Sequence, residues 1–163
     1  MAATMARAVT AAIIEAGKWI DTGLQNKMKM AETVADKSYV NTSVDVINQR
    51  ILGRYQNGMG KTWDDPNHMK FFNDGAATFP YLSDGMWFLT QHKRWGLIKE
   101  HPDYLAVARQ VNQIELYKEA ASALKISVPR EPMRSSRLMD GVVWDGKDPR
   151  KYAEGFAIRA GAA

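Results

Sequence analysis

The 163-residue sequence contains no cysteine. This absence excludes a disulfide framework and any thiolate chemistry, although it does not decide the compartment. The sequence also lacks an apolar run that approaches the roughly 18 residues of a membrane-spanning helix. Its alanine-rich N-terminus is interrupted by Arg7 and Glu15, and no small-residue cleavage site follows. The N-terminus therefore predicts a structural helix rather than a secretory signal.

The sequence also has little excess of one sign of charge over the other. The 22 basic and 18 acidic residues give a net charge of +4 and a pI near 9.3. The densest basic cluster is Lys125, Arg130, Arg134 and Arg137, in a proline-containing stretch that we interpret as a solvated loop, and we predict no nucleic-acid partner. Hydrophobic residues make up 45% of the chain, so residues 1–163 are expected to form a single domain with a real core.

The most distinctive stretch runs from Phe79 to Leu97. Pro80 disfavours helical backbone at Phe79, and Ser83 or Asp84 could cap a helix that starts near Ser83. Apolar residues at spacings of three and four cover a broad surface of this helix, which both Trp87 and Trp95 share. We therefore predict that this helix is the packing centre of the domain.

The remaining pattern is also mainly helical. Helices are expected over residues 5–21, 26–37 (with Met30, Val34 and Leu24 inward), 44–52 (capped within Asn41-Thr42-Ser43), 103–112, 114–124 and from Pro149 onward, with Tyr152, Phe156 and Ile158. Residues 54–78 predict a long loop with a turn of helix around Asn67 to Phe72. Residues 126–149 predict an irregular segment, with one short extended piece at Val142–Trp144 between two Asp-Gly pairs.

The sequence contains partial matches to phosphate-binding, metal-binding and catalytic motifs, but none is complete. Gly58-Met59-Gly60-Lys61-Thr62 ends like a phosphate-binding loop, but Tyr55 stands where the first glycine belongs and Asp64-Asp65-Pro66 stands where a helix should follow. Asp64, Asp65, Asn67 and His68 could suggest a metal site, yet the same residues suit a turn and a cap. His68, His92 and His101 have no nucleophile or carboxylate at a telling spacing. We therefore predict no catalytic, cofactor or metal residues, and no enzyme.

Several separated motifs resemble one family. The stretch Phe79-Pro80-Tyr81 through Arg94-Trp95-Gly96 resembles the C-terminal part of the solute-binding proteins of nitrate, nitrite, cyanate and bicarbonate ABC transporters. Further matching pieces follow the same order along the chain: Ile14–Asp21, Arg50–Tyr55, Leu116–Ala121, Arg134-Ser135-Ser136 and Asp140–Gly146. The resemblance covers about residues 6–158.

This resemblance implies a mainly α fold, namely the helical C-terminal segment of a two-lobed α/β periplasmic-binding-protein clamp, with little or no sheet of its own. The resemblance also implies that family members are much longer, and that the residues that contact the anion would lie mostly outside the portion matched here. We therefore assign no ligand-binding residue. The alanine-rich face of residues 5–20 is expected to be an exposed apolar patch, so we expect self-association or the need for a partner. The loop over residues 54–78 is expected to face the interlobe cleft or a partner.

The resemblance implies the substrate-binding component of an importer for a small inorganic anion, most simply nitrate/nitrite or bicarbonate, with the ABC transporter membrane subunits as partners. The alternatives are a cytoplasmic nitrate sensor or regulatory domain of the same fold and a free-standing helical interaction module. The implied location is periplasmic or membrane-associated. The absence of a visible signal peptide is also compatible with the cytoplasm.

Overall fold

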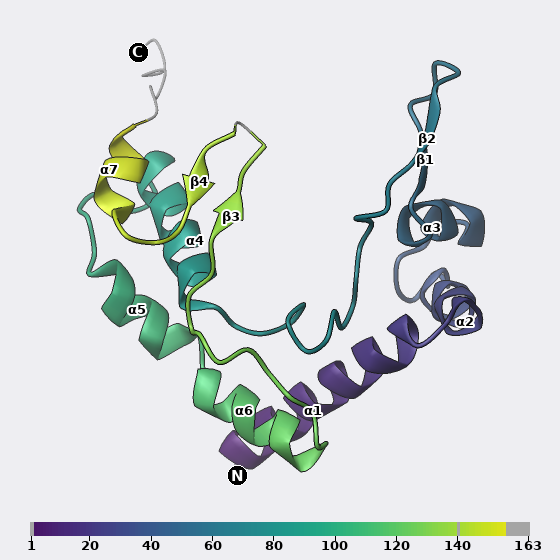
Figure 1. The fold of residues 1–163 in the computed structure, drawn as a ribbon, viewed down its shortest axis with the longest axis horizontal. Coiled ribbons are helices and arrows are strands. Elements are labelled where there is room, and N and C mark those ends of the chain that lie inside the picture. Colours follow the sequence, from purple (N-terminus) through teal and green to yellow (C-terminus); the bar gives the residue numbers. More distant parts are fainter. Residues whose placement is uncertain (1, 140, 156–163) are drawn as a thin grey trace. The chain divides into compact units, whose positions relative to one another are not determined.

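The structure is a computed structural model that describes residues 2–139 and 141–155. Figure 1 shows the elements that these residues form. The helices are α1 (Ala2–Asp21), α2 (Leu24–Val34), α3 (Val44–Ile51), α4 (Leu82–Arg94), α5 (Tyr104–Val111), α6 (Ile114–Ala123) and α7 (Pro149–Glu154). The strands are β1 (Arg54–Gln56), β2 (Thr62–Asp64), β3 (Ser136–Arg137) and β4 (Val143–Trp144). The mainly α fold with little sheet is thus confirmed.

The described residues group into two compact units. Unit 1 comprises residues 2–78 and 120–128, and unit 2 comprises residues 79–119, 129–139 and 141–155. Each unit contains one antiparallel hairpin, β1–β2 in unit 1 and β3–β4 in unit 2. A single-domain organisation stays a prediction.

In unit 1, α1 packs on α2 and α2 packs on α3. The helices meet through small and β-branched side chains, with Ile14, Ala31 and Ile51 buried. The predicted cap of α3 is confirmed, since the Val46 N–H donates to Ser43 Oγ at 3.4 Å. The expectation that Leu24 points inward is wrong. Leu24 is the first residue of α2, where no preceding turn covers it, and its side chain is 58% exposed.

In unit 2, α4 begins one residue before the predicted start, but not with the predicted cap. Tyr81 precedes the helix and makes no side-chain capping bond. Ser83 Oγ instead accepts from the backbone N–H of Arg134 at 3.0 Å. The Asp84 carboxylate takes a bidentate pair from the Arg134 guanidinium, at 3.0 and 2.6 Å. Both polar side chains therefore tie the segment before β3 to the first turn of α4.

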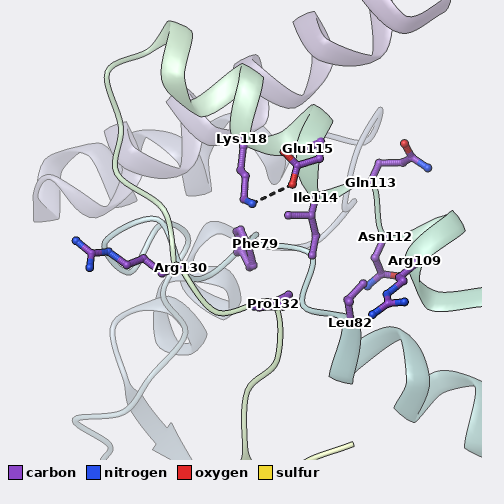
Figure 2. Close-up of a pocket in the computed structure, with 10 residues that line it drawn as sticks. All are labelled: Phe79, Leu82, Arg109, Asn112, Gln113, Ile114, Glu115, Lys118, Arg130 and Pro132. Carbon is purple, nitrogen blue, oxygen red and sulfur yellow. Dashed lines mark hydrogen bonds and ion pairs between the residues drawn. The ribbon is translucent and has the colours of Figure 1, made fainter. Parts of the chain in front are cut away.

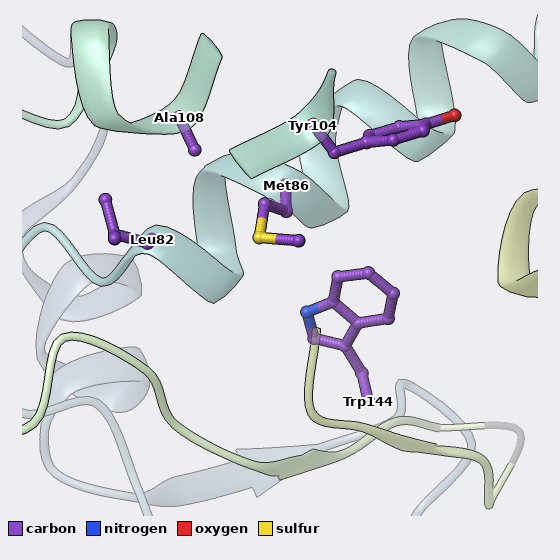
Figure 3. Packing of buried hydrophobic residues seen from close by; sticks show 5 residues of the cluster. All are labelled: Leu82, Met86, Tyr104, Ala108 and Trp144. Carbon is purple, nitrogen blue, oxygen red and sulfur yellow. The ribbon is translucent and has the colours of Figure 1, made fainter. Parts of the chain in front are cut away.

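The core of unit 2 gathers on α4, as Figure 3 shows. Its buried members are Leu82, Met86, Tyr104, Ala108 and Trp144. The Trp144 indole N–H donates to the buried carbonyl of Ser83 at 2.9 Å, so β4 is fixed to the helix by both packing and a hydrogen bond.

The prediction that Trp87 and Trp95 share this packed surface is confirmed for Trp87 and wrong for Trp95. Trp87 is half-buried and donates to the Tyr152 hydroxyl at 3.0 Å. Trp95 follows the last turn of the helix, and 69% of it is exposed. The packed surface of α4 therefore does not extend to Trp95.

Two further expectations for the loops need correction. The segment over residues 54–78 contains the β1–β2 hairpin, and residues 67–72 form no helical turn. The extended piece predicted at Val142–Trp144 is confirmed as β4, but its partner β3 was not expected. Two- and three-residue strands are too short to show an alternating pattern. Phe156 and Ile158, predicted for the last helix, and Asp140 of the matched motif lie outside the described residues.

Candidate functional site

The β1–β2 hairpin of unit 1 is the most conspicuous surface feature in the predicted long loop. Tyr55 on β1 faces Trp63 on β2 in register, and their rings stack with centroids 5.7 Å apart. Arg54 and Asp64 form the adjacent cross-strand pair at 3.8 Å, with both side chains more than 80% exposed. This exposed ion pair contributes little to stability, so the aromatic pair supplies most of the cross-strand packing.

The turn of the hairpin contains the rejected phosphate-loop motif. Asn57 Oδ1 accepts the backbone N–H groups of Met59 and Lys61, at 2.9 and 3.1 Å. Gly58 and Gly60 adopt positive φ angles of 74° and 84°, which glycine favours. Strand β2 follows directly, where a phosphate-binding loop would need a helix. The stretch is therefore a glycine-rich surface turn and not a phosphate-binding loop.

Open hollows flank the hairpin on the surface of unit 1. One of about 530 Å³ is lined by residues of both strands and by Gln49. Another of about 400 Å³ also includes Val46 and Arg50 of α3. Arg54, Tyr55 and Trp63 line both hollows. An aromatic pair with neighbouring guanidinium groups can stack against a planar or apolar surface, which suits contact with another polypeptide segment.

The base of the hairpin is held by the residues that suggested a metal site. Asp65 Oδ1 accepts the Asn67 N–H at 2.8 Å, and the Asp65 carbonyl lies 3.2 Å from His68 Nδ1. His68 Nε2 lies 3.4 Å from the Lys27 ammonium of α2. These contacts form a turn and connect it to α2. Within the described residues, no group of three or more His, Cys, Asp or Glu side chains could hold a metal ion.

Asp21, at the end of α1, is a polar anchor in unit 1. Its Oδ2 accepts backbone N–H groups from Phe71, Phe72 and Asn73, at 3.0, 2.8 and 3.3 Å. Burial favours the neutral acid, but the three N–H donors and the nearby Lys27 ammonium outweigh it and lower the pKa of Asp21. The carboxylate therefore stays charged and holds the end of the long loop against α1.

The histidines show structural rather than catalytic arrangements. His101, before α5, lies 2.8 Å from the Tyr104 hydroxyl through Nδ1 and 3.1 Å from Glu154 of α7 through Nε2. Burial raises the pKa of Tyr104, so its hydroxyl stays protonated at neutral pH. Tyr104 packs in the core of unit 2 and lines none of the hollows described above. His92 is exposed on α4. The His101 contacts therefore connect the start of α5 to α7.

An exposed apolar face runs along α1. Met5, Val9 and Ile13 are spaced by four, so they share one side of the helix, and 69%, 54% and 53% of each is exposed. The predicted exposure of this face is confirmed. Across residues 2–139 and 141–155, every helix falls short of the length or apolar character needed to span a membrane.

Comparisons with known proteins place this geometry in a family. No protein-family model matches the chain. The chain is 34% identical over 159 residues to the nitrate/nitrite binding protein NrtA of Nostoc sp., covering 94% of this chain and 36% of the relative. It is 25% identical over 159 residues to the bicarbonate-binding protein CmpA of Synechococcus elongatus, covering 90% and 35%.

A third relative is the nitrate import ATP-binding protein NrtC of Synechocystis sp., 26% identical over 151 residues, covering 93% of this chain and 22% of that protein. Among solved structures, the crystal structure of the periplasmic nitrate-binding protein NrtA from Synechocystis PCC 6803 matches with a TM-score of 0.83 at 31% identity, covering 94% of this chain and 41% of that one. The chain thus spans little more than a third of the binding proteins it matches. By sequence and by fold, it belongs to the nitrate/nitrite- and bicarbonate-binding protein family, of which it matches a C-terminal portion.

Proposed function

We propose that the chain is the C-terminal part of the substrate-binding component of an ABC importer for a small inorganic anion, nitrate/nitrite or bicarbonate. The similarity to the NrtA proteins carries this proposal, because it extends over 94% of the chain in both sequence and structure. The chain acts by binding rather than by catalysis, as do the solute-binding proteins that it matches.

The anion is held mainly by the portion of such a protein that lies outside this match. The chain corresponds to 36% of the Nostoc relative, so most of a binding protein's surface is not represented in it. The β1–β2 hairpin supports contact with a further polypeptide segment, since Trp63 and Met59 are 44% and 84% exposed on it. We infer that the hairpin faces the cleft between the lobes or a partner.

The exposed face of α1 fits the same arrangement. Met5, Val9 and Ile13 form an apolar stripe that a second lobe would cover, and the isolated chain would self-associate through it. The membrane subunits of the importer would be the further partners. The corresponding location is periplasmic or at the membrane surface.

A second candidate function rests on the similarity to NrtC. This nitrate import ATP-binding protein matches 93% of the chain. The chain could therefore serve as a regulatory portion of a transport ATPase, with the same fold sensing the anion instead of delivering it.

Calorimetric titration tests the proposal. The purified chain is titrated with nitrate, nitrite and bicarbonate at millimolar concentration, and so is a chimera in which the chain replaces the matching portion of the Nostoc NrtA protein. We expect no saturable binding by the chain alone and binding of one anion by the chimera.

Two results would contradict the proposal. Saturable binding of an inorganic anion by the chain alone would show that it carries a site of its own. A folded chimera that binds none of the three anions would show that the chain cannot complete the clamp.

A further inference from the structure

Unit 2 contains a cavity of about 330 Å³ that the proposed function does not use (Figure 2). Its apolar lining comes from Phe79, Leu82, Ile114 and Pro132. Phe79 and Leu82 are only 4% and 6% exposed, so they belong to the folded core, whereas Arg109, Arg130 and Pro132 lie on the exposed edge of this open hollow. Its volume lies at the lower end of the range typical of small-molecule sites.

The charged lining of the cavity is predominantly basic. Arg109, Lys118 and Arg130 are accompanied by a single acid, Glu115. The Lys118 ammonium binds the Glu115 carboxylate at 2.9 Å, so these two charges compensate each other. Among the described residues, neither Arg109 nor Arg130 is engaged in an ion pair, and Figure 2 shows them on opposite sides of the apolar lining. Arg109 and Arg130 thus bring two guanidinium groups without an ion pair to the edge of the cavity, and the Arg130 side chain extends away from the apolar lining in Figure 2.

The wall beside Arg109 is held in place before any ligand arrives. Asn112 Nδ2 donates to the Tyr81 carbonyl at 2.8 Å and approaches the Pro80 carbonyl at 3.4 Å. Gly85 of α4 lies so close that a Cβ there would stand 2.5 Å from Asn112 Oδ1. These contacts join the end of α5 to the start of α4. Such preorganisation lowers the entropy cost of binding a small ligand.

We propose that this cavity binds a small organic anion with an apolar body, such as an aryl or alkyl carboxylate. The apolar lining would bury the body, and a guanidinium would take the carboxylate through paired N–H donors. A neutral molecule would leave the guanidinium groups uncompensated. An inorganic anion would leave the apolar lining unused, so this site differs in ligand class from the anion site of the importer.

The binding test uses the full chain labelled with ¹⁵N and two matched probes, 4-phenylbutyrate and its neutral amide. Amide resonances are followed by NMR during titration. We expect 4-phenylbutyrate to shift the resonances of Leu82, Asn112 and Ile114 in a saturable way. The neutral amide should bind at least 5-fold more weakly.

Variants then separate specific recognition from general charge. Arg109→Gln combined with Arg130→Gln should weaken 4-phenylbutyrate binding at least 5-fold. Arg137→Gln combined with Arg150→Gln removes the same charge from unit 2 outside the cavity lining and should leave binding unchanged. Unfolding midpoints of all variants verify that each is folded.

Four outcomes would overturn the proposal. These are equal affinity for the acid and the amide, equal loss in the two double variants, saturable shifts confined to residues outside the cavity, and no saturable binding of the carboxylate. Displacement of the probe by millimolar nitrate would also overturn it, because charge alone would then be recognised.

Discussion

Helices α1 and α4 are both amphipathic, yet they relate to the described structure in opposite ways. Helix α4 has 13 residues and buries five of them, Leu82, Ser83, Met86, Thr90 and Gln91. Helix α1 has 20 residues, and of those whose burial is described, three are buried: Ile14, Gly17 and Ile20. A long apolar helix that buries so little in its own unit carries surface suited to something else.

The two helices are also fixed by different forces. Helix α4 is held by a hydrophobic cluster, with Trp144 and Arg134 as added polar contacts. Helix α1 is held at its end by one carboxylate, Asp21, which binds three backbone N–H groups. The stability of unit 2 should therefore respond most to loss of apolar volume, and that of unit 1 to loss of charge.

The largest expected effect comes from Trp144→Ala. The substitution removes the largest ring of the unit 2 cluster and leaves the Ser83 carbonyl without its indole donor. We expect the free energy of unfolding to fall by about 3–5 kcal/mol, measured by urea denaturation followed by circular dichroism. Trp95→Ala is the control, because Trp95 is 69% exposed, and it should change stability by less than about 0.5 kcal/mol. Equal losses in the two variants would refute the hydrophobic account of unit 2.

A smaller effect is expected from Asp21→Asn. The folded-state pKa of Asp21 lies below its ordinary value of 3.8, so the carboxylate stabilises the fold above about pH 4 and loses this effect as the pH falls through the folded-state pKa. Replacing charged hydrogen bonds by neutral ones should cost about 1–2 kcal/mol at pH 7.

The pH dependence distinguishes this polar anchor from a general surface charge. The difference between Asp21→Asn and the parent chain should shrink towards zero as the pH falls through the lowered folded-state pKa of Asp21, in urea titrations at several pH values. Asp64→Asn, in the exposed pair with Arg54, should cost less than about 0.5 kcal/mol at any pH. A cost for Asp21→Asn that is independent of pH would mean that shape, not charge, holds the loop to α1.

How well the sequence predicted the helices and strands depended on the length of each element. The 3.6-residue periodicity located α1 and α4 to within a few residues, because both are long enough to repeat the pattern several times. The hairpins were missed because β1 to β4 have two or three residues each, too few to show an alternating pattern. Arg134 contacts Asp84 across a sequence separation of 50 residues, which no local pattern encodes.

The candidate sites were less predictable than the fold. The cavity proposed for an organic anion joins Phe79 and Leu82 to Arg109 and Arg130, which come from three separate segments. The basic cluster that includes Arg130 was interpreted as a solvated loop, and that interpretation missed the side-chain pair of Arg134 with Asp84. Charge counts along a sequence do not reveal which cations find partners in space.

The smallest effect on stability at each site is expected from substitutions on the outer face of α1. Replacing Met5, Val9 and Ile13 together by Gln keeps helix-forming side chains at positions that are 53–69% exposed. The free energy of unfolding should change by less than about 0.5 kcal/mol per site. Self-association in sedimentation velocity and the fluorescence of an apolar dye should both fall, because the continuous apolar stripe is gone.

A matched triple variant tests whether position on the helix matters. Thr4→Gln, Ala8→Gln and Ala12→Gln alter three exposed positions, each one residue earlier, so the apolar stripe stays intact. This variant should associate and bind dye as the parent chain does. A parent chain that sediments as a compact monomer and binds no dye would show that α1 needs no cover. The contrast between α1 and α4 would then be one of degree of burial alone, and the proposed contact of α1 with a second lobe would lose its physical basis.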